Sequence, residues 1–235
     1  MSCMKLLCIV RRQGLALPVF TLVVASIICT ALVAYRVIAG AQVRHAYLVW
    51  NLFLAWLPLL FAMLAVERFE VAKSLRDRKF LALGIAWLLF FPNAPYIFTD
   101  LVHVLHAWWP SFWVQLMLIL LCAMTGFLAG FLSLQVMHRL VTRLRGRIVG
   151  WLFVLLVSGL TGFGVYLGRF VRLNSWDVVA DPIGLLYYTR SAVWNVLTQY
   201  HDLKFFALFT LFLVLGYVML HALTLQRHER ATIKA

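Results

Sequence analysis

Hydrophobic positions in this chain gather into six long runs instead of the short periodic patterns of a soluble fold. The runs cover residues 15–35, 46–66, 80–99, 111–136, 148–168 and 205–225. None of them contains Lys, Arg, Asp or Glu. A bilayer core about 30 Å thick needs roughly 20 apolar residues in a helix, and lipid offers the backbone no hydrogen-bond partner. Each run is therefore predicted to be a membrane-spanning helix.

Composition points to the same class of protein. Of the 235 residues, 64% are hydrophobic and 12% are charged, whereas soluble domains average about 25% charged residues. The apolar–polar alternation of outer-membrane barrel strands is absent. We expect an all-α, polytopic transmembrane helical bundle, with residues 1–235 forming a single integral membrane domain.

Basic residues between the runs predict how the chain is oriented. In chain order, the seven segments outside the runs contain 3, 2, 5, 0, 4, 4 and 3 Lys and Arg residues, so alternate segments hold 15 against 6. Since basic residues accumulate on the cytoplasmic side, we expect a multi-pass plasma (inner) membrane protein with both termini in the cytoplasm. Attraction to anionic lipid explains the net charge of +13, so membrane lipid is the expected partner and nucleic acid is not.

Small residues in the fourth and fifth runs predict close helix packing. Gly126 and Gly130 form a G-x-x-x-G pattern, and Ser158 and Gly162 repeat the spacing of four. Such positions let two helix backbones approach each other within a membrane. Packing within one chain and a seam between two copies both fit the pattern, so a homo-oligomer stays open.

Two prolines interrupt the third run. Pro92 and Pro95 remove two backbone donors, and they are expected to push the preceding residues, Phe91 and Ala94, away from helical geometry. Asn93 lies between them and is placed to bond the freed carbonyl groups. The alternatives are an ordinary kink and a discontinuous helix that lines a ligand cavity.

Polar residues with potential chemistry follow this break. Asp100 and His103 are one helical turn apart and could act as an acid–base pair. A carboxylate with His103 and His106 could hold a divalent metal, but in an α-helix the third residue rotates off the face of the first. These residues motivate one hypothesis, a membrane enzyme acting on a lipid-linked or extracytoplasmic substrate. His221, near the end of the last run, is expected to be a hydrogen-bonded packing residue.

A second polar segment follows the fifth run. Arg169 and Arg172 suit a phosphate or carboxylate, or they form surface ion pairs with Asp177 and Asp181. Residues 182–200 are then predicted to form an amphipathic helix at the outer surface.

Two segments carry a resemblance to a known family. The segments WLLFFPNAPYIFTDLVHVL (87–105) and GRFVRLNSWDVV (168–179) are similar to those of a bacterial family of multi-spanning membrane proteins classed as a domain of unknown function. The resemblance implies a bacterial plasma-membrane protein, and it implies no substrate, cofactor or catalytic residue. The residues that match its signature segments are Asn93, Tyr96, Asp100, His103, Arg169, Arg172, Asn174, Trp176 and Asp177.

The favoured hypothesis is a protein without catalytic activity that carries an outward-facing polar pocket. This pocket would bind a small anionic ligand or a lipid headgroup, or organise a partner, since several directed polar groups can fix a ligand. The candidate ligand-binding residues are Asn93, Tyr96, Arg169, Arg172, Asn174, Trp176 and Asp177. The enzyme hypothesis, with Asp100 and His103 as its candidate catalytic residues, is the alternative. The sequence identifies no cofactor.

Overall fold

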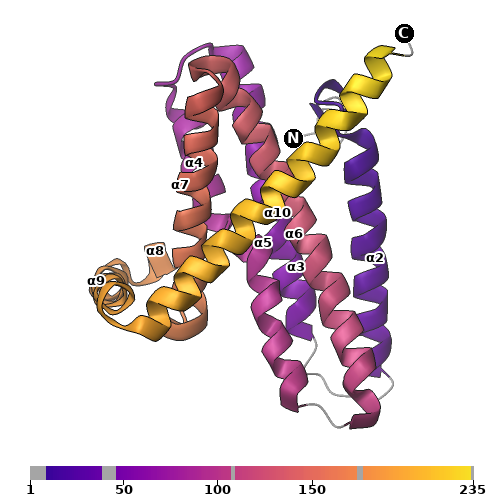
Figure 1. Cartoon of the computed structure of the whole chain (residues 1–235), viewed down its shortest axis with the longest axis vertical. Coiled ribbons are helices and arrows are strands. Elements are labelled where there is room, and N and C mark those ends of the chain that lie inside the picture. The colour runs from indigo at the N-terminus through magenta and orange to yellow at the C-terminus, as the bar shows by residue number, and fades with distance from the viewer. Residues whose placement is uncertain (1–8, 39–45, 107–108, 174–176, 234–235) are drawn as a thin grey trace. The chain divides into compact units, whose positions relative to one another are not determined.

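The computed structural model describes residues 9–38, 46–106, 109–173 and 177–233, which form helices and no strand. The elements in chain order are α2 (Ala16–Ile38), α3 (Ala46–Ala72), α4 (Arg78–Phe90), α5 (Asn93–Tyr96), η2 (Ile97–His106), α6 (Trp109–Arg145), α7 (Arg147–Tyr166), η3 (Leu167–Val171), α8 (Asp177–Ala180), α9 (Pro182–Thr198) and α10 (Tyr200–Ile233) (Figure 1). The element η2 is a 3₁₀-helix and η3 is a π-helical turn. The predicted all-α class is confirmed.

Six segments of the described chain are long and apolar enough to cross a membrane. They are Ala16–Ile38, Ala46–Ala72, Arg78–Val102, Phe112–Arg145, Arg147–Val171 and Tyr200–Thr224. Each contains most of one predicted run, so the chain is a multi-pass membrane protein. The third segment extends past the predicted end at residue 99 because the helical path continues into η2.

The chain divides into two compact units, Met1–Met137 and His138–Ala235, and the division falls within α6. In the first unit, α3 packs mainly against α4, α5 and α2. Its core combines side chains from α2, α3, the broken third span and the first half of α6. The buried members are Cys29, Val33, Leu48, Leu52, Ala55, Ala94, Ile97, Val104, Leu118, Ile119, Cys122 and Ala123.

The two glycines of α6 lie directly against the broken third span. A Cβ atom added to Gly130 would be 2.6 Å from Ala94 Cβ, and one added to Gly126 would be 2.8 Å from Ile97 Cδ1 and 3.2 Å from Ala94 O. A side chain at position 130 would therefore displace Ala94, and one at position 126 would displace the end of Ile97 and press on Ala94 O. The predicted packing of the G-x-x-x-G pattern within one chain is confirmed. The two glycines pack against the segment that contains the proline break.

The break itself differs in detail from the prediction. Phe91 keeps right-handed helical angles (φ −58°, ψ −39°), so the expected displacement of this residue from helical geometry is wrong. The chain instead shortens one hydrogen bond: Ala94 N donates to Phe91 O at 3.1 Å, three residues back instead of four. In a regular α-helix Ala94 N would donate to Phe90 O. Here Phe90 O accepts from Asn93 Nδ2 instead, at 3.0 Å. Asn93 therefore bonds a carbonyl group at the break, as predicted, but this is the carbonyl of Phe90 and not the expected one of Leu88 or Phe91.

A bidentate ion pair fixes the start of α4. Asp77 accepts from Phe80 N at 2.9 Å as the N-cap, and Arg68 donates to both of its carboxylate oxygens at 2.8 and 2.7 Å. The Arg68 hydrogen bonds, followed by the Phe80 amide, hold the pKa of Asp77 well below its ordinary value. The pair joins the end of α3 to the beginning of α4 across a short turn.

In the second unit, α10 packs along α7 and against α9. Gly162 makes this approach close, because a Cβ atom there would clash with Thr210 Oγ1 and lie 3.5 Å from Phe206 O. A small cluster of Tyr166, Ala192 and Val196 joins α7 to α9. Most of the predicted segment 182–200 forms a helix, α9, and Asp181 caps it by accepting from Gly184 N at 2.9 Å.

Candidate functional site

Asp100 lies inside the first unit, not on its surface. The residue is 3% exposed, and its Oδ2 accepts from Asn51 Nδ2 at 3.0 Å. Its neighbours in η2, Ile97 and Val104, are also buried. The sequence placed Asp100 outside the third span, and this is corrected: it belongs to Arg78–Val102. A carboxyl group buried at this depth needs a donor, and Asn51 on α3 supplies one.

Asp100, His103 and His106 were not expected to share one face, and the observed helix type shows that this expectation is wrong. These residues lie in η2, and residues three apart in a 3₁₀-helix are eclipsed, so all three positions follow one edge. The rotation expected for an α-helix does not apply. Among the described side chains, no three His, Cys, Asp or Glu residues form a metal-binding group. The side chains of His103 and His106 lie outside the described part of the structure.

Asn93 and Tyr96 form hydrogen bonds at the proline break itself. Asn93 donates to Phe90 O, and the carbonyl group of Tyr96 accepts from Thr99 Oγ1 at 2.7 Å. Both residues are partly exposed. These bonds stabilise the passage from α5 into η2, where every backbone group freed by a proline must find a partner inside the protein.

Arg169 and Arg172 lie where the fifth span ends in an unusual turn. Arg169 is part of the π-helical turn Leu167–Val171, and Arg172 follows it in the left-handed conformation (φ 64°, ψ 33°). Arg172 N and Leu173 N both donate to Leu167 O, the latter at 3.2 Å. The side chain of Arg172 is exposed, whereas Arg169 is partly buried. A non-glycine residue in this conformation raises the energy by about 1–2 kcal/mol, so other interactions must hold it there.

The remaining predicted residues follow this turn. Asn174 and Trp176 lie outside the described residues. Asp177 begins α8, and the carboxylate of Asp181 is used as the cap of α9. The first motif lies in one unit and the second lies in the other.

Asp202 is a further carboxylate of this unit, and the sequence offered no indication of its role. Asp202 Oδ2 accepts from Tyr166 Oη at 2.7 Å, which ties the start of α10 to the end of α7. Tyr166 is 3% exposed and lies beside the rings of Phe163, Phe170 and Phe205. Asp202 belongs to no recognisable sequence motif, so its bond to Tyr166 could not be predicted.

A cluster of polar and aromatic residues at the other end of the second unit was also missed. His138 Nδ1 is 2.7 Å from Tyr217 Oη, and the rings of Trp151 and His221 pack around this pair. Nδ1 of His221 is buried without a hydrogen-bond partner among the described residues, while its ring packs against those of His138, Trp151 and Tyr217. The available signal was two pairs at helical spacing, 138 with 142 and 217 with 221.

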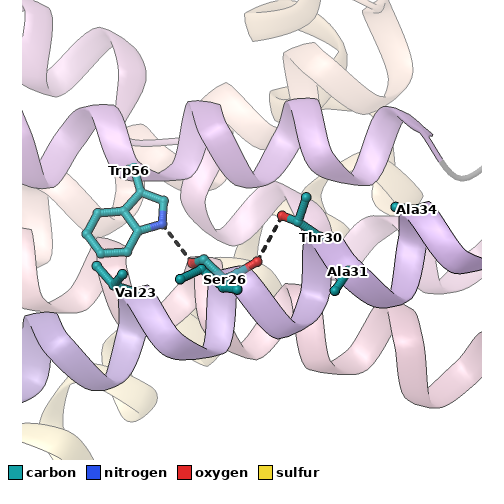
Figure 2. Close-up of a pocket in the computed structure, with 7 residues that line it drawn as sticks. Val23, Ser26, Thr30, Ala31, Ala34 and Trp56 are labelled. Carbon is teal, nitrogen blue, oxygen red and sulfur yellow. Dashed lines mark hydrogen bonds between the residues drawn. The ribbon is translucent and has the colours of Figure 1, made fainter.

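An open groove of about 570 Å³ runs between α2 and α3 in the first unit. Figure 2 shows Trp56 donating to Ser26 Oγ at 2.9 Å, and Thr30 Oγ1 donating to Ser26 O at 2.8 Å. The remaining lining is apolar and small: Val23, Ile27, Ala31 and Ala34. Its hydroxyl and indole groups are already bonded, so the groove presents a surface suited to lipid chains and has none of the predicted site residues.

Comparison with known proteins gives one family and no function. The model of a family described as a protein of unknown function, DUF1361, matches residues 50–216, a range that includes both quoted segments. Neither a curated protein nor a solved structure matches the chain.

The Asn51–Asp100 pair can be tested by removing one partner and then both. Asn51→Leu takes a donor from a buried carboxyl group and is expected to destabilise the protein by about 1–3 kcal/mol. The double variant Asn51→Leu/Asp100→Leu removes both polar groups and should recover most of this loss. Chemical unfolding of the detergent-solubilised protein measures both. A single variant as stable as the wild type would contradict the pairing.

Proposed function

The chain belongs to the DUF1361 family of proteins of unknown function, and we propose that it binds a phosphate-bearing headgroup or a similar small anion through Arg172. Arg172 is exposed at the end of the fifth membrane-spanning segment, where lipid headgroups meet the protein. A guanidinium group presents a planar set of donors that matches two oxygens of a phosphate. Arg169 adds a second positive charge within one turn.

The left-handed backbone at Arg172 is the observation that carries this proposal. Glycine would adopt the conformation without steric cost, yet the chain has arginine there. Unfavourable backbone geometry in a folded protein tends to persist where it positions a functional group. Here the exposed Arg172 comes immediately after a π-helical turn, which is itself frequent at functional sites.

The neighbouring helix supports a location at the membrane surface. Only Ala192 and Val196 of α9 are buried, while many of its large apolar and aromatic side chains are exposed. These are Ile183, Leu186, Tyr187, Tyr188, Val193, Trp194 and Leu197. An exposed apolar face rich in aromatic residues is typical of a helix that lies in the interface. Arg172 would then be held at headgroup depth.

Orientation is part of the same proposal. The distribution of basic residues supports both termini in the cytoplasm and the Arg172 segment on the outer side of a plasma membrane. Catalysis by Asp100 and His103 is supported less well. A general base must come within hydrogen-bond reach of its substrate, and Asp100 is 3% exposed and bonded to Asn51. We therefore propose anion binding, and not catalysis, as the function.

Two substitutions at Arg172 separate binding from folding. Arg172→Ala and Arg172→Gly both remove the guanidinium group, so each should weaken binding of phosphatidylglycerol about tenfold. Since glycine accepts the left-handed conformation, the Gly variant should unfold at a higher temperature than the Ala variant. Lipid-dependent thermal shift in detergent measures both quantities, with Arg190→Ala, an exposed arginine on α9, as the matched control. Unchanged lipid binding in both Arg172 variants would refute the site.

The orientation has its own measurement. A dual reporter inserted after Ala107, in the only predicted non-membrane segment without Lys or Arg, should show alkaline phosphatase activity and no green fluorescence. The same reporter at the C-terminus should give the reverse. Fluorescence at both positions would overturn the predicted sidedness, and with it the outer location of Arg172.

A further inference from the structure

At the beginning of α7 in the second unit, several polar groups have no partner within the part of the chain that the structure describes. Gly146 precedes the helix with φ 91° and provides no side-chain cap, and the first turn contains no acidic residue. Gly150 N is the first amide here to bond back to the helix start, at 3.1 Å to Gly146 O. The amides of residues 147–149 thus face the end of a 20-residue helix, where the helix dipole attracts an anion.

Buried side chains beneath this helix end also lack partners. His138 is 4% exposed, and its Nε2 has no hydrogen-bond partner among the described residues. Thr142 and His221 are partly exposed, but the atoms Thr142 Oγ1 and His221 Nδ1 are buried and also have no partner among the described residues. A Cβ atom added to Gly150 would be 2.9 Å from His138 Nε2 and in direct clash with Thr142 Oγ1, so both atoms are directed at the first turn of α7. Each such orphan group destabilises the folded protein unless a ligand supplies its partner.

Charge decides which kind of ligand these groups suit. The guanidinium group of Arg139 lies near enough to act electrostatically on the imidazoles of His138 and His221, and that of Arg147 acts on the imidazole of His221. Both arginines are exposed. Positive charge here disfavours a metal cation and favours an anion whose oxygens accept hydrogen bonds. A helix N-terminus, two guanidinium groups and orphan donors form one consistent donor set.

We propose that this end of the second unit binds a phosphate group. Arg139, Arg147 and the amides of residues 147–149 would hold its oxygens, and the Thr142 hydroxyl would donate from beneath after a change of rotamer. Tyr217 Oη, 2.7 Å from His138 Nδ1, can donate to that nitrogen and so leave the proton on Nε2, directed at the site. The phosphate belongs to an anionic lipid of the adjacent leaflet or to a soluble phosphate compound. This site is separate from Arg172 in residues and in position along the chain.

The test uses the full-length protein in detergent with an Arg172→Gly background, so that the site proposed above contributes nothing. Thermal shift is recorded with phosphatidylglycerol, with phosphatidylcholine and with inorganic phosphate. Arg147→Gln and Thr142→Val should each raise the apparent Kd for the stabilising ligand about tenfold. Thr142→Val should leave the ligand-free melting temperature unchanged or higher, because it removes an orphan hydroxyl group. Arg76→Gln, an exposed arginine in the first unit, is the charge-matched control.

The outcomes separate the two sources and the two proposals. Stabilisation by phosphatidylglycerol alone identifies a lipid headgroup, and stabilisation by inorganic phosphate identifies a soluble ligand. In either case the effect must decline in Arg147→Gln and Thr142→Val and persist in Arg76→Gln. Equal stabilisation in all variants, or no stabilisation by any of the three probes, would overturn this site without affecting the one at Arg172.

Discussion

The contact between Ala94 and the glycine pair of α6 constrains the rest of the first unit. A third span broken by two prolines can exist at membrane depth only if protein, rather than lipid, covers the interruption. Gly130 and Gly126 provide that cover, since neither leaves room for a side chain beside Ala94 and Ile97. With the break fixed in this way, η2 follows directly and brings Asp100 to Asn51 on α3. One close backbone approach thus determines where the polar residues of the first motif lie.

The two ends of the second unit carry different arrangements of polar groups. At one end, a π-helical turn is followed by a left-handed Arg172, close in the chain to α9. At the other, the start of α7 has no side-chain cap, and the buried atoms His138 Nε2 and Thr142 Oγ1 have no partner among the described residues. Both arrangements favour anions, which is the chemistry that membrane headgroups offer on both sides of a bilayer. The proposals therefore describe a protein that contacts lipid through defined sites as well as through its apolar surface.

The sequence predicts the spans well because continuous apolar runs and the absence of charge are strong, local signals. It also predicts the break and the partner for its carbonyl, since proline chemistry is local. It fails where tertiary packing decides: Phe91 keeps helical angles because the chain shortens a hydrogen bond at Ala94 instead. Asp100 reads as an external residue because nothing local shows that Asn51 covers it. His138 was overlooked because its partners, Tyr217 and His221, come from a helix about eighty residues later.

The size requirement at Gly130 tests the central contact most directly. Gly130→Ala should lower the unfolding free energy of the solubilised protein by about 1–3 kcal/mol, because the new methyl group meets Ala94. Moving the methyl group across the contact, in Ala94→Gly/Gly130→Ala, should restore most of the loss. Gly84→Ala, where a Cβ atom meets nothing within 4 Å, should be neutral or slightly stabilising. Equal stability of Gly130→Ala and Gly84→Ala would contradict the proposed packing of the broken span on α6.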